Sequence, residues 1–264
     1  RVYIGLGMIL FIMLINLRGV REAGTAFAIP TFFFVAMMYL MVIVGFIRFF
    51  AGTLGLVDFA PMDLMHEIEV PATLSLFLIL RAFSSGSAAL TGVEAISNGI
   101  TAFKEPRSKN AGITLMWMAV ILGSLMLGIT FLAHETAAMP SEAETIISQL
   151  ARTIFNSRGV LYLMIIGATM VILMMAANTA FAGFPRLSAL TAEDGFLPRQ
   201  LTWKGSRLVY SKGIVALAVI AALLVVLFQA SVNKLIPLYA IGVFTSFTLS
   251  QAGMARRWWK SGRM

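Results

Sequence analysis

The chain of 264 residues holds no cysteine, two histidines and few charged residues, which make up 12% of the total. The lack of cysteine excludes disulfides, thiol catalysis and cysteine-based zinc sites. His66 and His134 lie in different predicted outer loops, and neither has a second histidine at ligand spacing. Paired carboxylates, a Ser–His arrangement and a phosphate-binding loop followed by lysine are also missing. We therefore expect no catalytic residues, no metal site, no cofactor and no enzyme activity.

Hydrophobic residues are what the chain has in excess, at 59% of the sequence. The mean hydropathy of +0.89 is far above that of soluble domains, so the chain is expected to be an integral, multi-pass membrane protein whose main partner is the lipid bilayer. No signal peptide is recognised. The sequence opens at Arg1 in an apolar run without an initiator methionine, so we expect a fragment of a longer protein.

Seven apolar segments are close to or above the roughly 20 residues that span a bilayer. They predict an all-α transmembrane bundle in which residues 1–264 form a single domain. The predicted segments cover residues 2–16, 24–50, 74–103, 111–133, 159–184, 212–230 and 235–254. The longest connection is predicted at 185–211.

Basic residues are distributed unequally between alternate loops. One set of loops carries fourteen of them: Arg18, Arg21, Lys104, Arg107, Lys109, Arg186, Arg199, Lys204, Arg207, Lys212, Arg256, Arg257, Lys260 and Arg263. The other set carries five: Arg1, Arg48, Arg152, Arg158 and Lys234. The positive-inside rule places the first set and the C-terminus in the cytoplasm. The net charge of +8 thus reflects topology and anionic lipid, and no nucleic-acid partner is expected.

Segment 74–103 combines an apolar start with a centre rich in Gly, Ser and Thr, including Gly86, and an ionisable Glu94. A carboxylate in hydrocarbon costs several kcal/mol unless it faces a partner, an ion or water. Backbone groups freed by a helix break are tolerated only where they line a cavity. The pattern predicts a broken helix whose carbonyls suit a cation and whose amides suit a carboxylate.

Thr91 and Glu94 lie three residues apart and would share a face of the second half-helix. A hydroxyl beside a carboxylate can coordinate a cation or an ammonium group, with backbone carbonyls near Gly86 and Ala89 completing the site. The plain alternative is that the small residues only allow close helix packing and a neighbour neutralises Glu94. Arg81 snorkels outward, pairs with Glu94, or has a gating or structural role near the outer end.

Uncharged polar residues mark three further positions. Asn16, Asn178 and Thr179, near segment ends, are predicted to form helix–helix hydrogen bonds rather than to bind a ligand. Tyr239, one turn into the last segment, is either an interfacial aromatic or a hydroxyl facing a cavity. The runs 103–110 and 185–198 read as ordered cytoplasmic loops, which either latch an inner gate through ion pairs or form solvated turns.

Several motifs resemble the amino acid–polyamine–organocation superfamily of secondary transporters. They are TGVEA at 91–95 followed by KEPR at 104–107, NLRGVRE at 16–22, and PRL at 185–187 with EDG at 193–195 and Pro198. The longer pattern RAF…ALTGVEAISNG at 81–99 resembles the KimA-type potassium importers more narrowly. The G-x-E core is shared with amino acid permeases, so it is weak evidence for the identity of the substrate.

The resemblance implies a LeuT-like fold of two inverted repeats of five helices, with this chain as helices 4 to 10 and helices 1 to 3 absent. It implies Thr91, Glu94 and Tyr239 as cation-site residues, and potassium and protons as the transported species. It also implies a prokaryotic plasma membrane, a cytoplasmic C-terminal domain and a homodimer for the full-length protein.

Three functions follow as hypotheses. The first is proton-coupled potassium uptake by alternating access. The second is an amino acid or polyamine permease of the same superfamily, in which half-helix amides hold a substrate carboxylate. The third is a membrane sensor or structural subunit that transports nothing.

Overall fold

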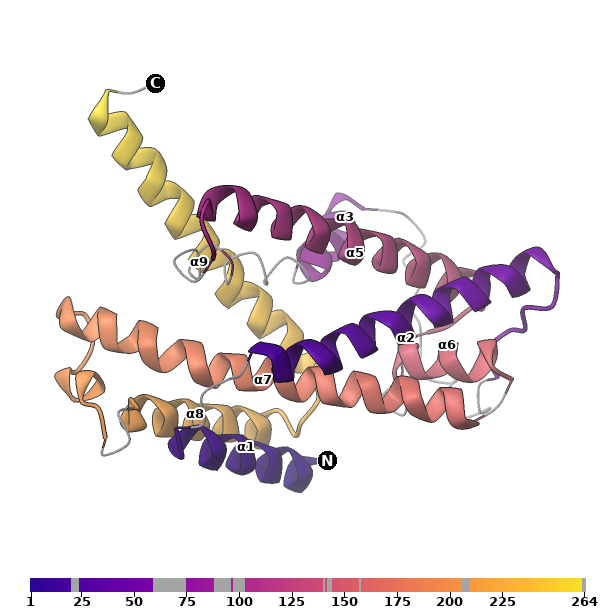
Figure 1. Cartoon of the computed structure of the whole chain (residues 1–264), viewed down its shortest axis with the longest axis horizontal. Coiled ribbons are helices and arrows are strands. Elements are labelled where there is room, and N and C mark those ends of the chain that lie inside the picture. Colours follow the sequence, from indigo (N-terminus) through magenta and orange to yellow (C-terminus); the bar gives the residue numbers. More distant parts are fainter. Residues whose placement is uncertain are drawn as a thin grey trace. The chain divides into compact units, whose positions relative to one another are not determined.

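The computed structural model describes residues 1–19, 24–58, 75–87, 96, 103–139, 141, 144–156, 158–205 and 209–262. Throughout these ranges the regular structure is helical (Figure 1). In chain order the helices are α1 (Val2–Leu17), α2 (Gly24–Phe50), α3 (Leu76–Ser87), α5 (Arg107–Glu135), α6 (Ile146–Ile154), α7 (Val160–Glu193), the 3₁₀ helix η4 (Arg199–Thr202), α8 (Ser211–Leu227) and α9 (Val232–Ser261). The all-α prediction is confirmed.

Four helices in the described part of the chain are long and apolar enough to cross a membrane, judged by length and composition: Phe27–Phe50, Arg107–Glu135, Val160–Glu193 and Lys234–Ser261. The shorter α1 and α8 are apolar as well. A helix suits hydrocarbon because all its backbone hydrogen bonds lie within the segment. Many large apolar side chains on α1, α2, α7 and α8 are exposed, as expected of surfaces that face lipid tails.

The chain divides into two compact units. The first comprises Arg1–Met65 and Ser124–Ala230, and the second comprises His66–Gly123 and Ser231–Met264. In the first unit, α7 packs against α1, α2 and α8, and α1 packs against α8 (Figure 1). In the second unit, α3 packs against α9.

The centre of the α1–α7–α8 group is a small apolar core. Ile12 of α1, Phe181 of α7, and Ile214 and Ala218 of α8 are buried together. Gly213 allows this approach, because a Cβ at that position would lie 3.0 Å from the Cα of Pro185 on α7. Small residues at a crossing let two backbones come close, which is how helices associate in lipid.

A second contact joins α2 to the half of α5 that belongs to the same unit. Phe46 stacks on Phe131 with ring centroids 5.3 Å apart. Tyr39 and Ser124 share a hydrogen bond of 2.6 Å between their hydroxyl oxygens. The pair links two apolar helices through their side chains, as hydroxyl groups do between helices in lipid.

The predicted loop at 185–211 is wrong in its first third. Helix α7 continues through Pro185 to Glu193, since a proline in a helix removes only one backbone hydrogen bond and is tolerated in membrane helices. The helix ends instead at Gly195, whose φ is +84°. The amide of Phe196 donates to the carbonyl of Thr191, a C-terminal cap that favours glycine.

Other predicted boundaries need correction too, among them the last segment, predicted at 235–254, which α9 extends to Ser261. Helix α5 begins at Arg107, inside the predicted loop 103–110, and His134 lies in its last turn rather than in a loop. The predicted outer loop between the fourth and fifth segments contains α6. The signal for α6 was present: Thr145 caps its first turn by accepting a hydrogen bond from the Ser148 amide, and Leu150 and Ile154 share its buried face.

Replacing Gly213 by alanine tests the α7–α8 crossing. The added Cβ would press on the backbone of Pro185, and we expect Gly213→Ala to lower the free energy of unfolding by about 1–3 kcal/mol. Gly167→Ala on α7 is the control, because no atom lies within 4 Å of the Cβ it would add. The measurement is thermal unfolding of the full-length protein in detergent, and equal melting temperatures for the two variants would contradict the close approach.

Candidate functional site

Two of the predicted cation-site residues lie on helices that pack together. Gly86 is a half-buried residue in the last turn of α3, and Tyr239 lies on α9, with 48% of its surface exposed. Both helices belong to the second unit. The helices that carry Gly86 and Tyr239 are thus in contact. A site shared between the two predicted segments would need this contact.

The remaining residues of the predicted site, Thr91, Glu94 and Ala89, lie outside the described residues. The twelve residues of α3 cover about 18 Å at the α-helical rise, which is less than a bilayer's hydrocarbon core of about 30 Å. Helix α3 alone is therefore too short to cross a bilayer, and within 88–102 the structure describes Ile96, which is helical. The break at mid-segment stays a prediction.

Arg81 is an exposed residue of α3, just over one turn before Gly86. The part of the chain that the structure describes places no carboxylate within ion-pairing distance of Arg81. An exposed guanidinium fits the outward-snorkelling alternative, in which the charge reaches water beyond the apolar stem. Pairing with Glu94 and a gating role stay predictions.

The polar residues near the segment ends form the predicted helix–helix hydrogen bond. The side-chain amide of Asn16 on α1 donates to the Asn178 side-chain carbonyl on α7 over 2.7 Å, and also to the carbonyl of Ile12. Thr179 instead donates to the carbonyl of Met175 on its own helix. Asn16 and Asn178 therefore join α1 to α7, whereas Thr179 makes no such link through its hydroxyl.

Arg48 joins the end of α2 to the end of α6, a contact that sequence reasoning missed. Its guanidinium donates to the carbonyls of Thr153 and Ile154, to the side-chain oxygen of Asn156 at 2.8 Å, and to the carbonyl of Thr53 at 2.7 Å. The last carbonyls of a helix lack intrahelical partners, so a cation there satisfies them. The only available signal was a basic residue closing an apolar run.

A second arginine holds the other side of α6. Arg152 forms an ion pair of 3.1 Å with Glu144 and donates to the carbonyl of Asp58. The Ser148 hydroxyl donates to Glu144 over 2.7 Å, so the Tyr162 hydroxyl of α7 is the donor in its 2.8 Å contact with Ser148. The network fastens α6 to α7.

Beside α6 lies an open pocket of about 740 Å³. Its lining residues are Gly55, Leu56, Asp58, Arg152, Thr153, Asn156 and Arg158. These belong to the loop set predicted to face outward. Among the described residues, no three His, Cys, Asp or Glu side chains gather in a way that could hold a metal ion.

In the run 103–110, where a latch and a solvated turn were the alternatives, the one ion pair among the described residues is local. Arg107 lies 3.1 Å from Glu105, and both side chains are more than half exposed. A pair between residues two apart in sequence joins no two helices, and exposed pairs contribute little to stability. At this position the solvated turn describes the structure better than a latch.

Comparison with known proteins places the whole chain in one group. Residues 1–263 match a family described as amino acid permease. The potassium transporter KimA of Bacillus subtilis (strain 168) is 43% identical over 257 residues. That alignment covers 97% of this chain and 42% of the relative, so the chain spans about two fifths of the length of the curated relative.

The bond between α1 and α7 can be measured with a double-mutant cycle. The two single variants, Asn16→Ala and Asn178→Ala, and the double variant should give a coupling energy of about 0.6–2 kcal/mol. Each single change already removes the hydrogen bond between the two side chains. The readout is the free energy of unfolding in detergent. Thr179→Val is the control and should not couple with Asn16→Ala. Additive effects of the two Asn changes would contradict a direct bond.

Arg48→Gln should loosen α6. Losing the guanidinium leaves the helix's last carbonyls without a cation, and such bonds contribute about 1.5–3 kcal/mol each in favourable settings. We expect hydrogen exchange of the α6 amides to rise by about tenfold or more. Arg48→Lys should not restore protection, because an ammonium lacks the planar fork.

Arg158→Gln is the matched control, since Arg158 lines the same pocket and is exposed. Unchanged exchange of the α6 amides in Arg48→Gln, or an equal rise in Arg158→Gln, would show that Arg48 does not hold the helix.

Proposed function

Because this chain belongs to the amino acid permease family, we propose that the protein it comes from is a secondary transporter that takes up potassium coupled to protons. The observation that carries the proposal is the 43% identity to a potassium transporter over 97% of this chain. The multi-pass helical architecture supports it, since such transporters alternate access around a site at the bilayer midplane.

The chemistry of the proposed site is the replacement of water around a cation. Potassium prefers oxygen ligands, and the Thr91 hydroxyl, the Tyr239 hydroxyl and backbone carbonyls near Gly86 and Ala89 supply them. Carbonyls at the end of a half-helix carry the negative end of the helix dipole, which favours a cation. The packing of α3 against α9 supports a site that both helices share.

Glu94 is the proposed charge-balancing or proton-carrying group. An ionised carboxylate balances the charge of a neighbouring cation, and a protonated carboxyl adds no charge of its own in hydrocarbon. In the second case Glu94 carries its proton across in the same step as the potassium ion, so that the two move inward together. We place the C-terminus in the cytoplasm, from the loop charges, and the full-length protein in a prokaryotic plasma membrane as a homodimer.

Amino acid or polyamine transport is the second candidate, favoured by the description of the matching family. In that case half-helix amides would bind a substrate carboxylate. Uptake of radiolabelled amino acids into the same cells separates the two candidates. Saturable amino acid uptake that potassium does not compete with would favour the second.

Rubidium uptake by the full-length protein in a bacterial strain without its own potassium transporters tests the proposal. Thr91→Ala and Glu94→Gln should each lower uptake by about tenfold or more, since each removes a ligand or the charge that balances the ion. Tyr239→Phe, which removes only a hydroxyl, should cost less.

Thr245→Val on α9 is the control, because its hydroxyl donates to the carbonyl of Ile241 on its own helix. It should transport rubidium like the unchanged protein. Full uptake in both Thr91→Ala and Glu94→Gln would refute the proposed site, and the absence of rubidium uptake by the unchanged, expressed protein would refute potassium transport.

A further inference from the structure

The described residues between α7 and α8, 194–205 with 209 and 210, form a folded element. Helix α7 stops at the glycine cap described above, and Pro198 leads into η4, which packs against both α7 and α8. The amide of Gly205 donates to the carbonyl of Val209 over 2.8 Å, which closes the last turn before α8. Side chains on this connection are therefore held at defined positions relative to the ends of the two helices.

Two lysines, Lys204 on this connection and Lys212 in the first turn of α8, lie over aromatic rings. The ammonium of Lys212 lies 4.2 Å from the centre of the Trp203 ring, and that of Lys204 lies 5.3 Å from the centre of the Tyr210 ring. A ring face attracts a cation within about 6 Å and takes up one side of it. The remaining N–H groups of each ammonium stay available to a second partner.

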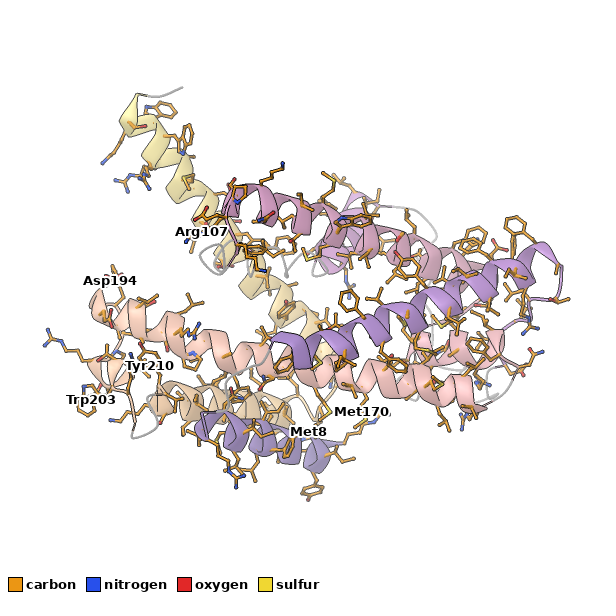
Figure 2. The ribbon with its side chains drawn as sticks, viewed as in Figure 1. Met8, Arg107, Met170, Asp194, Trp203 and Tyr210 are labelled. Atoms are coloured by element: carbon orange, nitrogen blue, oxygen red, sulfur yellow. The ribbon has the colours of Figure 1, made fainter. Side chains whose placement is uncertain are left out.

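The same element exposes both its charges and its apolar rings. Lys204 and Lys212 are exposed, Trp203 is 59% exposed, and Phe196 is 81% exposed. Figure 2 shows Trp203 and Tyr210 at the end of α7 where Asp194 also lies. Large exposed aromatic rings beside exposed ammonium groups are unusual on a turn that faces water, because burying the rings would be favourable there.

The level of these residues along the helices identifies the environment. From Gly213 to Leu227, α8 carries no charged side chain, so its apolar span begins directly after Lys212. Trp and Tyr at such a boundary occupy the headgroup region, with the ring towards the acyl chains and the polar atoms towards water. Phe196 and Trp203 can enter this layer while the two ammonium groups face the phosphates.

The charge of the element fits an anionic surface. Four described basic residues, Arg186, Arg199, Lys204 and Lys212, stand against two acidic ones, Glu193 and Asp194. Each basic residue near an anionic lipid surface strengthens binding severalfold, and the effect depends on its closeness to the headgroups. Lys204 and Lys212 are the two whose position the aromatic rings fix.

We propose that the α7–α8 connection is a headgroup site for an anionic phospholipid. Lys204 and Lys212, held by Tyr210 and Trp203, donate hydrogen bonds to the lipid phosphate, and the exposed rings lie at the level of the upper acyl chains. A lipid rather than a soluble phosphate is the occupant, because only a lipid covers the apolar surface of Trp203 and Phe196 together with the charges. The site is independent of which solute is transported.

Native mass spectrometry of the detergent-purified full-length protein tests the site, with dioleoyl phosphatidylglycerol and dioleoyl phosphatidylcholine as probes. The unchanged protein should retain phosphatidylglycerol in preference to phosphatidylcholine. Lys204→Gln combined with Lys212→Gln should reduce this preference by roughly tenfold. Lys204→Arg combined with Lys212→Arg should keep it, because arginine also stacks on aromatic rings and binds phosphate.

Two controls separate a built site from net charge. Lys104→Gln combined with Lys109→Gln removes the same charge from the loop before α5 and from the first turn of α5, and should leave the preference within about twofold. Trp203→Ala keeps every charge but removes the ring under Lys212, and should reduce the preference about threefold or more. Trp203→Ala also tests the site on its own if the Lys204→Gln, Lys212→Gln variant does not fold.

Three results would overturn the proposal. One is an unchanged preference in both Trp203→Ala and the folded glutamine variant. Another is an equal loss of the preference for phosphatidylglycerol in the Lys104 and Lys109 control variant, which would show that only the net charge matters. The third is displacement of phosphatidylglycerol by soluble glycerol phosphate at similar concentration, which would make the occupant a free phosphate.

Discussion

Hydrocarbon offers no hydrogen-bond partner, so each polar group inside the bilayer must find one within the protein. The described residues obey this rule at nearly every position. Hydroxyls within the spans donate to carbonyls of their own helices, as Thr169 and Thr245 do, or meet a partner across a helix interface, as Tyr39 does with Ser124. Asn16 and Asn178 satisfy each other between α1 and α7. Against this background, the sequence places Glu94 among Gly, Ser and Thr, and we propose that its partner is a solute rather than a neighbouring helix.

The rule relaxes at the membrane boundaries, and there the structure uses a different set of contacts. Arg48 of α2 satisfies the final carbonyls of α6, and Arg152 of α6 pairs with Glu144 in the loop before that helix. Between α7 and α8, Lys204 and Lys212 lie over aromatic rings instead. These charged contacts lie at or near the ends of helices. The spans themselves are held by shape, as the approach of Gly213 to Pro185 shows.

Helix positions were largely readable from the sequence because the length of an apolar run measures the bilayer directly. The predicted 24–50 coincides with α2, and 2–16 falls one residue short of α1. Errors arose where apolarity was not the deciding force. Helix α7 runs past Pro185, and the end of α6 is held by Arg48, a residue distant in sequence that no local pattern connects with that helix. Of the site, Gly86 and Tyr239 were placed on helices that do pack together. The choice between potassium and an amino acid as substrate depends on the atoms that surround the solute. The G-x-E core around Glu94 occurs in both kinds of transporter, so it does not identify the substrate.

The central claim is that Glu94 faces a water-filled path for a solute rather than lipid. These 264 residues contain no cysteine, so Glu94→Cys introduces one reactive thiol into this part of the chain. A membrane-impermeant methanethiosulfonate reagent needs a thiolate in contact with water. If Glu94 lines the ion path, the thiol reacts in the full-length protein and potassium slows the reaction, whereas Leu80→Cys, at an exposed apolar position on α3, stays unreactive. The claim would be contradicted if the thiol at position 94 were as unreactive as the thiol at position 80, both with and without potassium.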